Sequence, residues 1–150
     1  MVKIESATAV PEPEPVSAAA TAANGGRPPH VGIITIGGCG RAVLEAQHLL
    51  ARDGVAADVL RVRAFPFHPS IRPFVETHAR VFVVEQNRDG QLRSLLATEL
   101  EVPITRLESL RFYGGQPLSA PPVVAAILER LGVAPPGAAE PPELEVAGGS

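Results

Sequence analysis

Apolar positions between residues 31 and 132 follow two different periods. Four apolar runs are rich in β-branched residues and have the length of strands. They span residues 31–36, 57–65, 81–84 and 105–113. Four other segments repeat apolar side chains at the i, i+3 and i+4 spacing of an amphipathic helix. They span residues 42–50, 71–78, 92–100 and 124–131.

The alternation of these elements predicts the fold class. Strands that are separated by helical crossovers pair in parallel with right-handed connections. We therefore expect an α/β protein, a three-layer αβα sandwich around a mostly parallel sheet of roughly four to five strands. The run at residues 81–84 has no polar side chain, which predicts a strand covered on both faces. A late or edge strand of this sheet is free to run antiparallel.

Helix-capping residues stand at the expected ends of two helices. Asn87 or Asp89 is a candidate N-cap for the third helix, and Ser119 is a candidate N-cap for the last one. Gly132 follows the last apolar position of that final helix, where a glycine commonly ends a helix.

The two ends of the chain have a different composition from its centre. Residues 1–30 are rich in proline and alanine, and residues 133–150 repeat proline pairs and close on Gly-Gly-Ser. Such segments offer too little apolar bulk to pack. We expect a disordered arm, a folded domain at residues 31–132 and a disordered tail.

Composition excludes several classes of protein. The formal net charge is -3 with scattered basic residues, which argues against nucleic-acid binding. The single cysteine, Cys39, cannot form an internal disulfide and cannot alone hold an iron–sulfur cluster or zinc. No apolar run approaches the roughly 20 residues of a membrane helix, and the first residues lack a signal-peptide pattern. These features predict a cytoplasmic protein without a membrane partner.

A polar cluster follows the apolar run at residues 81–84. It consists of Glu85, Gln86, Asn87, Arg88, Asp89 and Gly90. The carboxyl end of a parallel strand is where open α/β sheets meet ligands and partners. Glu85 is either a tuned acid or base, or an acceptor for hydrogen bonds from the following turn, and we favour the second interpretation.

The rest of this cluster has two interpretations of its own. The amides of Gln86 and Asn87 suit the backbone of a neighbouring chain, while Asn87 can also simply adopt a left-handed turn conformation. Arg88, Asp89 and Gly90 are typical of a solvated turn. We interpret the whole cluster as an interface or positioning element, and we assign no catalytic residue.

A glycine-rich turn follows the first strand. Gly37, Gly38 and Gly40 could bind a phosphate at a helix N-terminus. The third glycine of a dinucleotide fingerprint is replaced by Val43, so we favour a tight turn that lets helix and strand approach. Cys39 within it is either a thiol with a lowered pKa or, as we favour, a plain turn residue.

The histidines and phenylalanines give weaker signals. His30, His48, His68 and His78 show no metal-ligand spacing, so we expect no metal site. His78 is interpreted as a helix C-terminal residue that the helix dipole stabilises. Three phenylalanines lie close together in the sequence, and we expect them in the core, with a docking patch as the alternative. They are Phe65, Phe67 and Phe74.

Four segments carry a resemblance to a known family. They are the glycine-rich turn at residues 37–40 and residues 60–67, 83–92 and 113–118. The third, Val-Val-Glu-Gln-Asn-Arg-Asp-Gly-Gln-Leu, is the most specific, and the fourth contains Gly-Gln-Pro before the final helix. With these segments, residues 31–132 resemble the C-terminal, transketolase-C-like domain of the α subunit of 2-oxoacid:ferredoxin (2-oxoacid:acceptor) oxidoreductases.

The resemblance implies an enzyme that decarboxylates a 2-oxoacid to an acyl-CoA and passes electrons to ferredoxin. It implies thiamine diphosphate, Mg and iron–sulfur clusters in the assembled complex, and none of them bound by this chain alone. The implied partners are the thiamine-binding and iron–sulfur subunits, and indirectly ferredoxin. The stretch before Val31 is too short for a thiamine-binding domain, so we expect a split subunit, a truncated product or a relic that serves in assembly. The alternatives are a free-standing nucleotide or coenzyme A binder and a non-enzymatic interaction module.

Overall fold

The computed structural model describes residues 29–134, which form alternating strands and helices. The strands are β1 (His30–Ile36), β2 (Ala56–Val62), β3 (Arg80–Glu85) and β4 (Leu107–Arg111). The α-helices are α1 (Gly40–Arg52), α2 (Ile71–Thr77), α3 (Gln91–Glu99) and α4 (Ala120–Leu131). Two short 3-10 helices precede α1 and β4, namely η2 (Gly37–Cys39) and η3 (Ile104–Arg106).

The sheet confirms the predicted fold class. Its four strands lie in the order β2-β1-β3-β4, and every pairing is parallel. Ile34 of β1 lies opposite both Leu60 of β2 and Val83 of β3. The antiparallel strand that the sequence allowed is absent from the described part of the chain.

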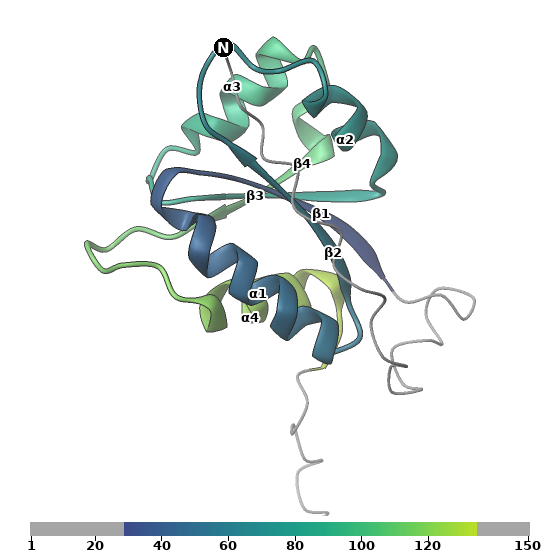
Figure 1. Cartoon of the computed structure of the whole chain (residues 1–150), viewed down its shortest axis with the longest axis vertical. Helices are drawn as coiled ribbons and strands as arrows, with labels where there is room; N and C mark the ends of the chain where they lie inside the picture. The colour runs from purple at the N-terminus through teal and green to yellow at the C-terminus, as the bar shows by residue number, and fades with distance from the viewer. Residues whose placement is uncertain (1–28, 135–150) are drawn as a thin grey trace, which may run out of the picture.

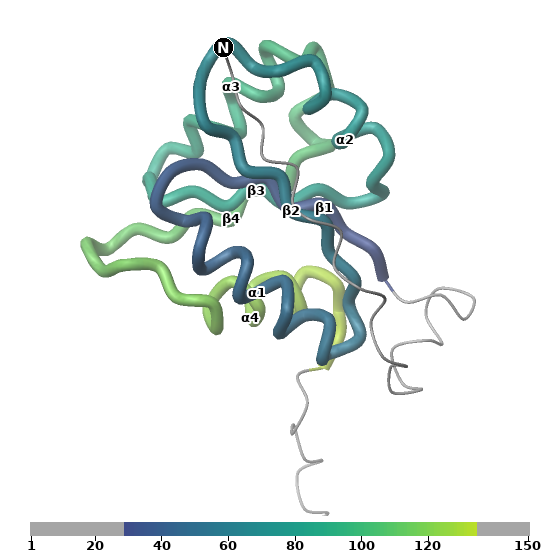
Figure 2. The backbone as a smooth tube through the Cα atoms, in the orientation of Figure 1, coloured from purple at the N-terminus to yellow at the C-terminus, as the bar shows by residue number. Residues whose placement is uncertain are grey.

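Helices cover both faces of the sheet, as the apolar run in β3 predicted. Figures 1 and 2 show α1 and α4 on one side and α2 and α3 on the other. Ile33, Phe82 and Val84 face the α1 and α4 side, where they pack with Val43 and Ile127. The opposite faces of the same strands pack beneath α2 and α3, so residues 31–35 of β1 and 81–85 of β3 are buried.

Several strand boundaries differ from the prediction. β1 begins at His30, where the prediction had residue 31, and β2 ends at Val62, where the prediction had residue 65. β2 is an edge strand whose last pair is Ile36 with Val62, so it ends where β1 turns away. β4 begins at Leu107 because residues 104–106 form a 3-10 turn.

The helix ends follow the sequence signals in part. Gly132 ends α4 with a φ of 69°, as predicted, and Ser119 occupies the N-cap position without a side-chain capping hydrogen bond. Between residues 29 and 134, no helix has the length and apolarity needed to span a membrane. Of the predicted arm at residues 1–30 and the predicted tail at residues 133–150, residues 1–28 and 135–150 lie outside the described residues. His30, at the end of the predicted arm, belongs to β1.

Candidate functional site

The candidate site lies at the end of the sheet that is formed by the carboxyl ends of β1, β3 and β4. The turn after β1, the turn after β3 and the loop between β4 and α4 all lie at this end, toward the left in Figure 1. The parallel register brings them together, since all strands point the same way. The glycine turn and the polar cluster, far apart in the sequence, thereby become neighbours: a Cβ built on Gly38 would lie 3.8 Å from Oε1 of Gln86.

Two of the segments that carry the family resemblance meet in one pocket. The side-chain amide of Gln86 donates a hydrogen bond to the Gln116 carbonyl at 3.2 Å. The pocket has a volume of about 530 Å³. Its lining comes from both segments: Gln86, Asn87, Arg88, Phe112, Tyr113, Gly114, Gly115, Gln116 and Pro117.

Glu85, at the end of β3, is completely buried. One carboxylate oxygen accepts hydrogen bonds from the Asn87 side chain at 2.6 Å and from the Leu92 backbone at 2.9 Å. The other oxygen accepts from the Arg93 backbone at 3.2 Å. Leu92 and Arg93 belong to the first turn of α3, whose N–H groups have no partner within the helix. Glu85 therefore caps α3 from the preceding strand, in agreement with the local interpretation of this residue.

This arrangement corrects the predicted cap of α3. The N-cap position belongs to Gly90, with a φ of 64°, and not to Asn87 or Asp89. Asn87 still contributes, because its Oδ1 accepts from the Gln91 backbone at 3.2 Å. The left-handed conformation considered for Asn87 is wrong, since Glu101 is the non-glycine residue with positive φ among those described.

The polar cluster thus divides into an inner and an outer set. Glu85, Asn87 and Gly90 build the turn, whereas Gln86, Arg88 and Asp89 are exposed. Arg88 pairs with Asp89 at 3.1 Å on the surface, where such pairs contribute little to stability. The Arg88 carbonyl also accepts a hydrogen bond from Arg111 at 2.6 Å, which ties the turn to the end of β4. The outer set is the more accessible to another molecule, although the half-buried Asn87 also lines the pocket.

The glycine turn is shaped by an arginine of β2. The Arg61 guanidinium donates to the Gly37 carbonyl at 3.0 Å. A Cβ at Gly40 would lie 2.9 Å from Nε of Arg61, so a side chain there would shift the Arg61 guanidinium from its present position. Gly37 has a φ of 65°, a value that favours glycine. These contacts support the tight-turn interpretation, while a phosphate site at Gly37, Gly38 and Gly40 stays a prediction.

Cys39 is buried beneath the same turn, with 2% of its surface exposed. Burial raises the pKa of its thiol, and the nearby Glu85 carboxylate adds to the effect. Hydrogen bonds with the Thr35 side chain and the Gln86 backbone lower the pKa but do not outweigh burial. A buried thiol that holds its proton is a poor nucleophile, which agrees with the interpretation of Cys39 as a structural turn residue.

The three neighbouring phenylalanines divide between the core and the surface. Phe67 and Phe74 pack against the core beneath α2 and α3, as expected. Phe65 is 56% exposed, so the core prediction is wrong for this residue. Its ring contacts that of Phe67 edge to face, with centroids 5.5 Å apart.

Comparison with solved structures agrees with the predicted resemblance. A 2-oxoglutarate:ferredoxin oxidoreductase from Magnetococcus marinus, solved with 2-oxoglutarate, coenzyme A and succinyl-CoA bound, matches with a TM-score of 0.61 and 25% identity. The match covers 70% of this chain and 18% of the oxidoreductase chain. A split-gene transketolase, an inactive beta4 tetramer, shares the fold with a TM-score of 0.55 and 23% identity, over 71% of this chain and 40% of that one.

These matches confirm that the fold is transketolase-C-like and similar to a domain of an oxidoreductase subunit. The chain spans less than half the length of either matched protein. No protein-family model matches the sequence. No curated protein sequence matches it significantly.

Proposed function

We propose that this chain is the C-terminal domain, or a split or truncated part, of the α subunit of a 2-oxoacid:acceptor (ferredoxin) oxidoreductase. Its role is subunit assembly. The oxidative decarboxylation of a 2-oxoacid to an acyl-CoA is carried out in the complete complex. Thiamine diphosphate, Mg and the iron–sulfur clusters belong to the partner subunits, and ferredoxin is reached through them.

The pocket formed by residues 86–88 and 112–117 carries this proposal. Except for Phe112, these residues lie in the segments 83–92 and 113–118, which were identified from the sequence as similar to the family. The two segments are joined by the hydrogen bond from Gln86 to the Gln116 carbonyl. Tyr113, which belongs to the second segment, is 65% exposed. Aromatic and arginine side chains on a surface are typical anchors of protein interfaces. The outer set of the polar cluster and Tyr113 therefore suit contact with another polypeptide.

The hydrogen bonds of Glu85 explain why this surface is fixed in shape. Its carboxylate holds both Asn87 and the start of α3. A turn that is ordered before binding loses less conformational entropy when a partner docks. Glu85, Asn87 and Gly90 position the surface in this proposal, and Gln86, Arg88 and Asp89 make the contacts.

Co-expression with the thiamine-binding and iron–sulfur subunits encoded in the same genome tests the proposal. We expect the tagged chain to co-purify with them, and the complex to reduce ferredoxin with a 2-oxoacid and coenzyme A. Gln86→Ala together with Tyr113→Ala should reduce the recovered partner at least about tenfold, the scale of losing interface anchors. The control is Arg72→Ala, in an exposed ion pair with Glu76 on α2. Recovery of the chain alone from every co-expression would overturn the proposal.

The Arg61 guanidinium gives one observation in favour of a nucleotide or coenzyme A binder. It places a positive charge at the glycine turn, 3.0 Å from the Gly37 carbonyl, at the start of α1. Phosphates favour helix N-termini with nearby cations. Calorimetric titration of the full chain with coenzyme A distinguishes this alternative, because binding that Arg61→Ala abolishes would place the ligand at the turn.

A further inference from the structure

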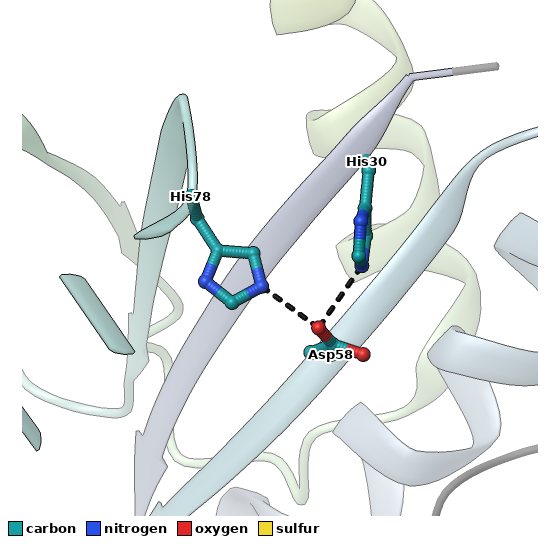
Figure 3. A group of neighbouring side chains, drawn as sticks. All are labelled: His30, Asp58 and His78. Atoms are coloured by element: carbon teal, nitrogen blue, oxygen red, sulfur yellow. Dashed lines mark hydrogen bonds and ion pairs between the residues drawn. The ribbon is translucent and has the colours of Figure 1, made fainter. Parts of the chain in front are cut away.

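Two histidines and an aspartate meet near the amino ends of β1 and β2, at the end of the sheet opposite the pocket. His30 begins β1, Asp58 lies in β2, and His78 follows α2. Nε2 of His30 lies 3.0 Å from Oδ2 of Asp58, and Nε2 of His78 lies 2.8 Å from the same oxygen. Figure 3 shows both rings directed at the carboxylate. One ligand atom from each residue lies within 4.8 Å of the other two.

A glycine in β1 makes room for this cluster. Gly32 lies opposite Asp58 in the sheet, two residues after His30 and therefore on the same face. A Cβ at Gly32 would lie 3.0 Å from Cγ and 3.2 Å from Nδ1 of His78. The absent side chain lets the His78 ring lie against the strand, between β1 and the end of α2.

The second nitrogen of His78 is held by the protein. Nδ1 lies 2.7 Å from the Phe74 carbonyl, which can only accept, so this nitrogen carries hydrogen. Nε2 is then the nitrogen that either shares a proton with Asp58 or binds a metal ion. Metal-binding histidines almost always donate their other N–H to a carbonyl or carboxylate in this manner, which fixes the ring and its tautomer.

Arg106 fixes the backbone that carries His78. Its guanidinium donates to the carbonyls of Val75 at 2.9 Å, His78 at 2.8 Å and Ala79 at 3.1 Å. His78 itself is only 8% exposed. One ligand is therefore rigid and buried, while His30 and Asp58, with about half of each side chain exposed, face solvent.

We propose that His30, Asp58 and His78 form a binding site for a divalent transition-metal ion, with Zn²⁺ as the expected ion. Two imidazole nitrogens and one carboxylate suit zinc better than Mg²⁺ or Ca²⁺, which prefer oxygen ligands. Three protein ligands leave a fourth tetrahedral position on the solvent side for water or an exchangeable ligand. The two nitrogen–oxygen separations, 3.0 and 2.8 Å, need to open only slightly, since ligands about 2.1 Å from zinc lie about 3.4 Å apart in a tetrahedron.

This site is independent of the proposed assembly role. It lies at the amino end of the strands, whereas the pocket of residues 86–88 and 112–117 lies at their carboxyl end. Failure of metal binding leaves partner recovery unaffected, and the two experiments have separate readouts.

The experiment uses the full chain, free of any histidine tag and treated with a chelator. Co²⁺ is titrated and followed by visible absorption, because Co²⁺ bound by imidazole and carboxylate ligands shows d–d bands. ZnCl₂ is titrated separately by calorimetry. We expect one ion per chain and a rise in the melting temperature with Zn²⁺, because a ligand that binds the folded state stabilises it. Asp58→Asn and His30→Gln should each weaken binding at least about tenfold, the size seen even for outer-shell losses.

His48→Gln is the matched control, because His48 is exposed on α1 and should leave binding unchanged. A second readout on the unaltered chain does not depend on variants that fold. Zn²⁺ should shift the imidazole signals of two of the four histidines in NMR spectra. The proposal would be overturned by the absence of both binding heat and Co²⁺ absorption, or by equal binding of the metal to Asp58→Asn and to the unaltered chain. The cluster would then be a carboxylate that bridges two imidazole rings through hydrogen bonds.

Discussion

Glu85 accepts a hydrogen bond from the backbone N–H of Leu92 at 2.9 Å, so the last residue of β3 caps the helix that begins after the turn. The carboxylate is completely buried, and its hydrogen-bond donors are the Asn87 side chain and two N–H groups of α3. The shape of the candidate interface therefore depends on a side chain that no partner can reach.

Removal of the Glu85 carboxylate should destabilise the domain. Glu85→Ala leaves the buried N–H of Leu92, the partly buried N–H of Arg93 and the Asn87 amide without their acceptor, at a cost of about 3 kcal/mol in the free energy of unfolding. Glu85→Gln keeps one acceptor oxygen but turns an NH₂ group toward a donor, and should cost about 1 to 2 kcal/mol. Urea denaturation measures both. Glu76→Gln, which breaks an exposed pair with Arg72, is the control and should change stability by less than about 0.5 kcal/mol.

Gln86 and Asn87 are adjacent but should respond differently to alanine. Gln86 is exposed and bonds only to the Gln116 carbonyl among its described partners, so Gln86→Ala should leave the melting temperature nearly unchanged. Asn87 bonds to the buried Glu85 carboxylate, so Asn87→Ala should lower stability by about 1 kcal/mol or more. Thermal denaturation of the two variants provides the comparison. Equal melting temperatures would contradict the division into inner and outer residues.

The sequence predicts the elements well because their signals are local. The four apolar residues of β3 identify a covered strand, and Gly132 identifies the end of α4, without knowledge of any distant residue. The sequence predicts Glu85 as an acceptor for the following turn, but it does not identify Leu92 as a donor, because Leu92 is seven residues away and the contact depends on how the turn folds back. The carboxyl-edge position of the polar cluster is predictable, since it follows from the strand that precedes it.

The cluster of His30, Asp58 and His78, in contrast, has no local signal in the sequence. These residues have no common spacing, and His78 is 20 residues from Asp58. They meet because β1 and β2 pair in a register that sets Gly32 beside Asp58 and because α2 ends against the same strand. The spacing of the histidines in the sequence could not predict this cluster, since its three residues come from three elements.

Gly32 should tolerate no side chain. A Cβ at this position would lie 2.9 Å from Cε1 of Phe74 and 3.0 Å from Cγ of His78, so both rings must move. Gly32→Ala should lower stability by about 1 to 3 kcal/mol, the cost of overpacking a filled site. Gly38→Ala is the control. A Cβ at Gly38 would lie no closer than 3.8 Å to any atom outside its sequence neighbours, and that nearest atom is Oε1 of Gln86. Urea denaturation of both variants tests the difference, and equal effects would contradict close packing at Gly32.

Cys39 should make the domain less stable in alkaline solution. Burial raises the pKa of its thiol above the ordinary value of 9.0. In the pH range between the ordinary and the raised pKa, the unfolded chain releases the thiol proton while the folded chain keeps it. The unfolded state then binds fewer protons than the folded state, so stability falls as the pH rises through this range.

Cys39→Ala removes this contribution and provides the test. Its free energy of unfolding is expected to be lower at neutral pH by about 1 kcal/mol, because a buried sulfur is lost. Between about pH 8 and pH 10, however, the variant should lose less stability than the unaltered chain, since it has no thiol to titrate. Denaturation curves across this range give the difference between the two slopes. A parallel decline would contradict a raised pKa for the Cys39 thiol in the folded state.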